Sequence, residues 1–204
     1  MALKLKFIKV KDKLLCLKVT IHLFALFPLI TLYINAFNDQ LGADPVEAVI
    51  HFTGIGAFNL LLITLMVTPI AKRFKLGYLQ KTRRLIGLYA FLYGLFHLFN
   101  FLAFEVQFDF NLFFSEIFER PYITVGLAAM LLLVLLALTS ISRIKRKMGN
   151  NWQKLHNFNY LIVLLVAIHF YWSVKSDVTE PVIYWLITLL LLRLRISKLK
   201  SWFS

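Results

Sequence analysis

Six long stretches of apolar residues dominate this sequence and limit the folds open to it. A helix that crosses a membrane needs about 20 mainly apolar residues, because the hydrocarbon core is ~30 Å thick and each residue rises ~1.5 Å. The stretches cover residues 15–37, 54–71, 84–104, 122–141, 157–174 and 178–196. They lack the alternation of apolar and polar residues that a membrane β-barrel needs. The sequence therefore predicts an all-α integral membrane protein, a six-helix bundle forming a single transmembrane domain over residues 1–204.

Both ends of the chain carry basic residues that bear on this prediction. The N-terminus is basic and then apolar, as in a signal peptide, but residues 15–37 are long enough to span and no small-residue cleavage pattern follows. We therefore expect an uncleaved first span. The sixth stretch ends at Arg193 and Arg195, whose charged groups we expect to snorkel to the membrane interface.

The distribution of charge predicts the orientation of the bundle. All 23 lysines and arginines except Arg120 and Lys175 lie at the N-terminus, in the second-to-third or fourth-to-fifth loop, or in the C-terminal tail. All ten acidic residues except Asp12 lie on the opposite side. Lysine and arginine collect in cytoplasmic loops, so we expect both termini to be cytoplasmic. The net charge of +13 is then explained by the orientation of the helices in the membrane and by contact with lipid headgroups, and no nucleic-acid partner is expected.

Two of the five histidines are predicted to share one depth in the membrane. An ionisable side chain within a span is costly, so each needs a reason to be there. His97 and His169 each lie thirteen residues beyond the cytoplasmic edge of a predicted helix, the third and the fifth, which run the same way. Both are therefore about 20 Å from that edge. Two neutral imidazoles at one level can bind one haem iron from opposite faces, which places a haem between these helices. The alternative is that each histidine only bonds a neighbouring hydroxyl or carbonyl.

His156 raises the question of a second, inner haem. On the third helix the positions thirteen and fourteen before His97 are Arg84 and Arg83, and arginine does not bind iron. Thirteen residues also rotate an ideal helix by about 220° net, so His156 and His169 would not share a face. His156 is therefore either a second haem ligand, a partner of an acidic cofactor group, or an interfacial residue.

The remaining polar residues have less specific interpretations. His22 could complete an inner haem, but a plain buried histidine is the simpler interpretation. His51 precedes the second span, with Thr53 as a candidate helix cap. Gly94, one turn before His97, would let a flat porphyrin approach the third helix. Cys16 is the only cysteine, which excludes disulfides within the chain and a Cys-ligated iron–sulfur cluster.

Five segments, together with His97 and His169, resemble one known family. The segments are residues 41–45 (LGADP), 51–54 (HFTG), 83–88 (RRLIGL), 120–126 (RPYITVG) and 152–158 (WQKLHNF). In this order, and over nearly the whole chain, they are similar to the MsrQ family. These proteins are the haem-binding membrane subunits of bacterial methionine sulfoxide reductases, related to the membrane domains of ferric reductases and NADPH oxidases.

The resemblance implies a function, cofactors and partners. It implies a bacterial inner-membrane protein that passes electrons to MsrP, a periplasmic molybdenum enzyme that repairs oxidised methionines. The implied cofactors are haem b and FMN, and the implied donor is the quinone pool or a cytosolic flavin reductase. His97, His156 and His169 match the family's important histidines. Arg83 and Arg84 replace the inner histidine of the wider superfamily, and suit an FMN phosphate or a flavin-reductase partner instead.

The sequence leaves three candidate functions. The first is an electron-transfer subunit that performs no substrate chemistry itself. The alternative is a transmembrane haem reductase that acts directly on ferric iron or oxygen. A transporter or assembly factor is disfavoured, since no broken helix and no internal repeat is visible in the sequence.

Overall fold

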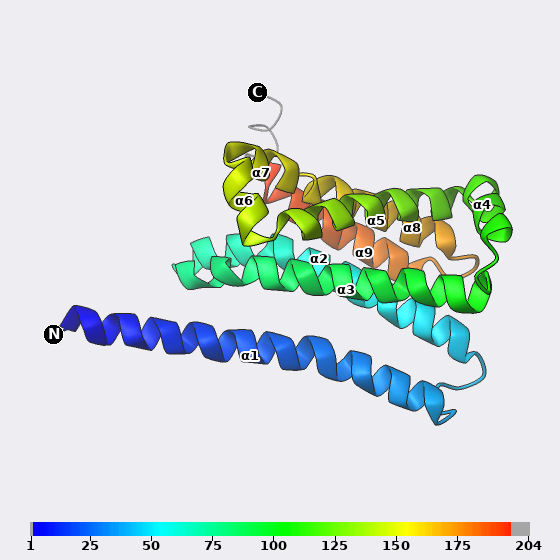
Figure 1. The fold of residues 1–204 in the computed structure, drawn as a ribbon, viewed down its shortest axis with the longest axis horizontal. Coiled ribbons are helices and arrows are strands. Elements are labelled where there is room, and N and C mark those ends of the chain that lie inside the picture. Colours follow the sequence, from blue (N-terminus) through cyan, green and yellow to red (C-terminus); the bar gives the residue numbers. More distant parts are fainter. Residues whose placement is uncertain (1, 197–204) are drawn as a thin grey trace.

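The computed structural model describes residues 2–196, with side chains from residue 10 onward, and this part of the chain is all helical (Figure 1). The predicted all-α class is confirmed. The elements are α1 (Ala2–Phe37), α2 (Pro45–Arg73), the 3-10 helix η1 (Gly77–Thr82), α3 (Arg83–Asn100), the π-helical segment η2 (Phe101–Glu105), α4 (Phe110–Glu119), α5 (Pro121–Thr139), α6 (Ser142–Met148), α7 (Asn150–His156), α8 (Asn159–Ser173) and α9 (Thr179–Arg193).

Five helical stretches of the described chain are long and apolar enough to cross a membrane. They are Val10–Phe37, Pro45–Arg73, Gly77–Glu105, Pro121–Thr139 and Asn150–Ser173. Each of them overlaps one of the first five predicted spans, and the second and fifth begin earlier than predicted, at Pro45 and Asn150. The sixth prediction falls on α9, whose 15 residues rise only about 22 Å, less than the hydrocarbon thickness. The sixth span therefore stays a prediction, as does the cytoplasmic location of the termini.

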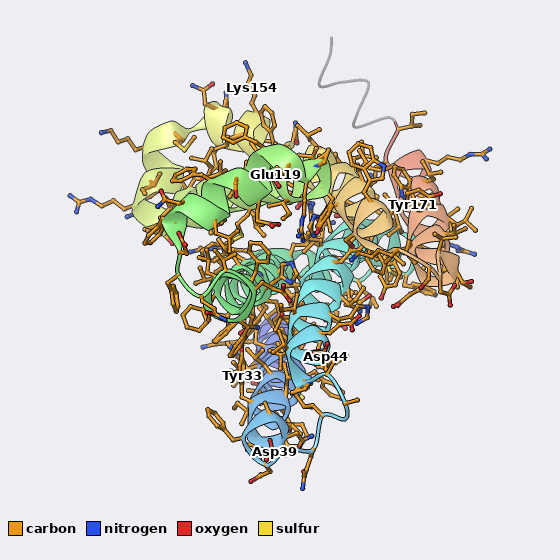
Figure 2. All side chains as sticks on the ribbon, turned by 90° about the vertical axis from the view of Figure 1, so that its right-hand side faces the viewer. Tyr33, Asp39, Asp44, Glu119, Lys154 and Tyr171 are labelled. Carbon is orange, nitrogen blue, oxygen red and sulfur yellow. The ribbon has the colours of Figure 1, made fainter. Side chains whose placement is uncertain are left out.

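The long helices alternate in direction, so α3 and α8 run the same way (Figure 1). The start of α1 and the end of α9 lie at the same end of the molecule, together with α6 and α7. We call this the basic end, because the two connections that lie there, between the second and third and between the fourth and fifth spans, are rich in lysine and arginine. The opposite end, which carries α4 and the acidic loops, is called the outer end and faces the viewer in Figure 2.

The second helix begins earlier than the hydropathy pattern predicts. It starts at Pro45, where the side chain of Asp44 accepts a 2.8 Å hydrogen bond from the backbone N–H of Glu47. An acidic cap followed by proline is a typical helix start. Thr53 is buried inside α2, and its hydroxyl donates to the carbonyl of Val49 at 2.7 Å. The expectation that Thr53 caps the helix is therefore wrong.

Two helix pairs form the body of the bundle, because α2 packs most extensively on α3 and α5 on α8. Apolar side chains from both pairs and α9 form the core, including Phe58, Leu61, Leu65, Ala90, Leu133, Ile162, Val163 and Leu191. Helix α1 lies along the edge of the α2–α3 pair and buries only a narrow stripe, Ala25, Leu29 and Leu32. Most of its large apolar side chains are exposed, as expected of a helix that faces lipid.

Candidate functional site

His97 on α3 and His169 on α8 lie next to each other inside the bundle. Their ring centroids are 6.0 Å apart and their planes are nearly perpendicular, at 84°. The predicted common depth of the two histidines is therefore confirmed. The parallel direction of α3 and α8 brings together two side chains that are 72 residues apart in the sequence.

Each of the two rings is oriented by a backbone carbonyl of a neighbouring helix. Nδ1 of His97 lies 2.9 Å from the carbonyl oxygen of Ile50 on α2. Nδ1 of His169 lies 2.7 Å from the carbonyl oxygen of Tyr122 on α5. A carbonyl oxygen only accepts, so each Nδ1 carries the hydrogen and each Nε2 keeps a free lone pair. Histidines that bind metals are oriented in this way.

A glycine lies directly against each imidazole ring. A Cβ atom at Gly54 would lie 3.0 Å from Nδ1 of His97. A Cβ atom at Gly126 would lie only 2.6 Å from Nδ1 of His169. Any larger residue would force the ring or the helix to move. Both glycines are therefore needed for the close approach of helix and histidine.

The two histidine environments repeat each other along the chain. Each consists of a carbonyl, a glycine four residues later and a histidine 47 residues after the carbonyl. The members are Ile50, Gly54 and His97 in one set and Tyr122, Gly126 and His169 in the other. The α2–α3 and α5–α8 pairs are thus two versions of one arrangement. The sequence analysis found no repeat and missed these glycines, although the common separation of 43 residues between glycine and histidine was a signal.

The two neighbouring imidazoles could bind one metal ion that receives its remaining ligands from a cofactor. Imidazole nitrogens bind transition metals at about 2 Å, so two rings on one ion have facing nitrogens about 4 Å apart and centroids further back. The 6.0 Å centroid separation is compatible with this arrangement. No group of three or more His, Cys, Asp or Glu that could hold a metal ion occurs in residues 2–196. Two histidine ligands from the protein are enough for a haem iron, because the porphyrin supplies the remaining ligands.

Comparison with known proteins assigns the family. Residues 53–167 match the family described as ferric reductase like transmembrane component. Over 187 residues the chain is 43% identical to the protein-methionine-sulfoxide reductase heme-binding subunit MsrQ of Cronobacter sakazakii and 42% identical to that of Pectobacterium atrosepticum. Each alignment covers 91% of this chain and 94% of the relative. The chain belongs to the MsrQ family. The resemblance found in the sequence is thereby confirmed.

In this member of the MsrQ family, His156 lies away from the histidine pair, at the basic end. It is the last residue of α7, and a break at Asn157 and Phe158 separates it from α8. Its ring stacks on Trp152 at 3.9 Å between centroids, and its Nε2 lies 3.1 Å from the hydroxyl of Thr139. Within the described residues, these contacts include no second histidine. A second haem on His156 therefore gains no support from the contacts.

The two arginines singled out in the sequence also lie at the basic end. Arg83 donates from Nε to the carbonyl of Thr64 at 3.2 Å, and Arg84 donates to the hydroxyl of Ser142 at 3.3 Å. Both carry charges that act on His156. Arg83 and Arg84 therefore lie near enough to His156 for their charges to act on it, and their role in a cofactor or partner site stays a prediction.

Three further expectations for this MsrQ relative are corrected. Gly94 faces Met130 of α5, whose sulfur would lie 3.4 Å from a Cβ, so Gly94 serves the packing of α3 on α5. His22 is exposed on α1 and bonds the hydroxyl of Tyr89, so it is not a buried residue. Arg193 is exposed as expected, but Arg195 is only 5% exposed and does not snorkel. Tertiary packing around the end of α9 overrides the expectation from its position in the sequence.

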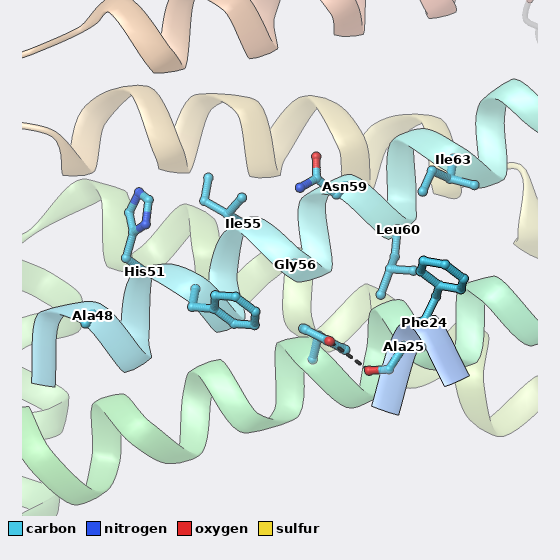
Figure 3. A pocket seen from close by; sticks show the side chains of 11 residues that line it. Phe24, Ala25, Ala48, His51, Ile55, Gly56, Asn59, Leu60 and Ile63 are labelled. Atoms are coloured by element: carbon cyan, nitrogen blue, oxygen red, sulfur yellow. Dashed lines mark hydrogen bonds between the residues drawn. The ribbon is translucent and has the colours of Figure 1, made fainter. Parts of the chain in front are cut away.

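A groove of about 560 Å³ opens between α1 and α2 (Figure 3). Its lining is mainly apolar, and three polar side chains reach it, those of His51, Asn59 and Tyr93. The side-chain carbonyl of Asn59 accepts a 2.9 Å hydrogen bond from Tyr184. The hydroxyl of Tyr93 donates to the carbonyl of Ala25 at 2.8 Å and so holds α1 against α3.

Acidic side chains mark the outer end of the molecule, where Figure 2 labels Asp39, Asp44 and Glu119. Nε2 of His51 lies 3.5 Å from Glu180, and both side chains are half-exposed. Hydrogen bonds from the side chain and backbone of Thr179 hold the pKa of Asp177 below its ordinary value. The outer end is therefore negatively charged at neutral pH.

Proposed function

We propose that this chain is the haem-binding membrane subunit of a bacterial methionine sulfoxide reductase, in which His97 and His169 would hold the iron of one haem b. The observation that carries the proposal is the pair of rings 6.0 Å apart, each with Nδ1 bonded to a carbonyl and Nε2 free. The relatives named as heme-binding subunits of the reductase support the same assignment.

The residues of the chain hold and tune this site. The carbonyls of Ile50 and Tyr122 would keep each imidazole in the tautomer that binds iron, and the hydrogen bond that Nδ1 donates to each carbonyl makes Nε2 a more basic metal ligand. Gly54 and Gly126 leave room for the rings against α2 and α5. The surrounding apolar side chains limit the access of water. When bound, the haem supplies one-electron oxidation and reduction of its iron.

We propose further that the subunit passes electrons to MsrP at the outer end, in the periplasm of the bacterial inner membrane. The acidic side chains of this end offer a surface for a partner with complementary charge. The pair His51 and Glu180 is half-exposed there and available for contact. This direction of transfer rests on the family relationship together with the location of the histidine pair.

The donor is the quinone pool or a cytosolic flavin reductase, and each has a feature in its favour. The groove between α1 and α2 combines apolar walls with Asn59 and His51, as the amphipathic head of a quinol requires (Figure 3). The basic end, with Arg83 and Arg84, suits a flavin reductase or the phosphate of FMN.

One observation disfavours a reductase that acts directly on ferric iron or oxygen at the metal. If His97 and His169 both held the iron of one haem, the protein would leave no coordination site on that iron for a small substrate. An electron-transfer subunit needs no such vacancy.

The partnership is tested by reoxidation in membranes that hold the chain with and without MsrP. The haem is first reduced, and methionine sulfoxide is then added without oxygen. We expect reoxidation only where MsrP is present. Equal reoxidation without MsrP would contradict the proposed role as a subunit and favour direct reduction of a substrate.

A further inference from the structure

The carbonyl oxygen of Ile50, which accepts from Nδ1 of His97 at 2.9 Å, has a second side-chain partner. The hydroxyl of Thr53, one turn later on α2, lies 3.0 Å from the same oxygen and 2.7 Å from the carbonyl oxygen of Val49. A hydroxyl has one hydrogen to donate, so the two carbonyls share it. The hydrogen bond that orients His97 therefore shares its acceptor with Thr53.

Asn100 determines the direction in which Thr53 donates. It lies one turn beyond His97 on α3 and is fully buried, and its amide nitrogen is 3.4 Å from the hydroxyl oxygen of Thr53. The side-chain carbonyl of Asn100 accepts a 2.9 Å hydrogen bond from the hydroxyl of Tyr33 on α1. An amide nitrogen only donates, so the hydroxyl oxygen of Thr53 accepts from it and the hydroxyl hydrogen turns to the carbonyls. Side chains of three helices thus form one network that ends at the carbonyl of Ile50.

The second histidine has no equivalent of this network. The two sets of carbonyl, glycine and histidine are offset by 72 residues, which places Val125 and Trp172 where the first set has its threonine and asparagine. Valine has no hydrogen-bonding group in its side chain, and Trp172 is exposed. The carbonyl of Tyr122 accepts from His169 at 2.7 Å, and among the described residues no hydroxyl donates to that carbonyl. The network therefore acts on one histidine of the pair only.

We infer that Thr53, oriented by Asn100, is a positioning residue that makes the two haem ligands unequal. Neighbouring hydrogen bonds polarise one another, and a carbonyl that accepts from a hydroxyl is a weaker acceptor for His97. A weaker bond from Nδ1 leaves Nε2 less basic, and a less basic ligand favours ferrous over ferric iron. The reduction potential of the bound haem is then higher than two ligands like His169 would give. This inference rests on the proposed haem site.

The test uses the full chain purified with its haem, and variants of matched shape. Thr53→Val removes the hydroxyl and keeps the volume of the side chain, whereas Thr53→Ser keeps the hydroxyl. Thr64→Val is the control, because Thr64 is also buried on α2, donates to the carbonyl of Leu61 at 2.7 Å and accepts from the amide of Asn159 at 3.3 Å. Among the described residues, no histidine donates to the carbonyl of Leu61. The control therefore removes the same kind of network away from the histidine pair.

A potentiometric titration of the haem absorbance gives the ratio of reduced to oxidised haem at a fixed potential. We expect Thr53→Val to lower this ratio roughly threefold to tenfold, the range that one net hydrogen bond spans. A tenfold change corresponds to a potential lower by ~59 mV for one electron. Thr53→Ser and Thr64→Val should match the wild type. The inference is overturned if Thr53→Val leaves the ratio unchanged, or if Thr64→Val lowers it as much.

The second half of the bundle allows the reciprocal experiment. Val125→Thr would give the carbonyl of Tyr122 the hydroxyl partner that it lacks, at the same spacing of three residues along the helix. We expect this variant to raise the ratio of reduced to oxidised haem, because it weakens the hydrogen bond from His169 in the same way. Shifts of Thr53→Val and Val125→Thr in the same direction would contradict the inference.

Nuclear magnetic resonance of the full chain prepared without haem provides a readout that does not depend on the proposed function. The Nδ1–H proton of His97, assigned by its absence in His97→Ala, moves downfield when its hydrogen bond becomes stronger. We expect Thr53→Val to move this resonance downfield and to leave that of His169 in place. An unchanged His97 resonance would overturn the inference. A moved resonance with an unchanged haem potential would instead count against His97 as a haem ligand, and so against the proposed function.

Discussion

The Nδ1 atom of His97 lies 2.9 Å from the carbonyl oxygen of Ile50, and this contact decides which nitrogen of the ring is free. His169 has the same relation to Tyr122 on another helix pair. Two neighbouring rings, each with its Nδ1 bonded to a carbonyl, follow from two copies of one local arrangement.

Enlarging either glycine should disturb the histidine that lies against it. The methyl group of Gly126→Ala would lie 2.6 Å from Nδ1 of His169, and that of Gly54→Ala would lie 3.0 Å from Nδ1 of His97. We expect both variants to bind less haem, with the larger loss in Gly126→Ala because its overlap is more severe. Haem content per protein measures the effect.

Gly87→Ala is the matched control for the two glycine variants. It places the same methyl group on α3, but its nearest neighbour is 3.9 Å away, at ordinary contact distance. Its haem content should equal that of the wild type. A loss of haem in Gly87→Ala as large as in Gly126→Ala would show that helix stability, and not ring position, governs binding.

Replacement of His156 should leave the haem spectrum unchanged. His156 bonds Thr139 and stacks on Trp152 at the basic end, apart from the histidine pair. His156→Ala should therefore retain a ratio of about one haem per chain, at a stability cost of roughly 1 kcal/mol for the lost hydrogen bond. A wild-type ratio near two that falls to one in His156→Ala would contradict this and establish a second haem on His156.

Filling the groove between α1 and α2 should slow reduction by a quinol. Ile63 lines the groove, and Ile63→Trp would occupy part of its volume. Ile70→Trp adds the same side chain to an exposed position of α2 that does not line the groove. If quinol is the donor, haem reduction by added quinol should be slower in Ile63→Trp alone, while reduction by dithionite stays equal in both. Equal quinol rates in the two variants would favour the cytosolic flavin reductase.

Loss of the Tyr93 hydroxyl should loosen the first helix. It donates a 2.8 Å hydrogen bond to the carbonyl of Ala25, one of few buried contacts of α1. Tyr93→Phe should lower the free energy of local opening of α1 by about 1 kcal/mol. Hydrogen exchange of α1 should then be faster, with exchange of α8 unchanged as the internal reference. Unchanged exchange of α1 would show that its apolar stripe alone holds it.

Sequence patterns predict the features that depend on the residues of a single helix. Hydropathy locates five spans that the structure also has, and counting residues along parallel helices places His97 and His169 at one depth. The groups that hold these histidines come from other helices, and a carbonyl such as that of Ile50 carries no sequence signal. The burial of Arg195 depends on how α9 packs on its neighbours, so position along the helix predicts the wrong environment for it. Asp44 and Pro45 form a typical helix start and so indicate where α2 begins, but hydropathy alone places this start nine residues later.

The central claim is that His97 and His169 together hold one haem, and the absorption spectrum of the purified chain tests it most directly. The wild-type chain and His22→Ala, which alters an exposed histidine of α1, should both show a low-spin b-type spectrum with about one haem per chain. His97→Ala and His169→Ala should each lose that spectrum. An unchanged low-spin spectrum in both of these variants would contradict the account.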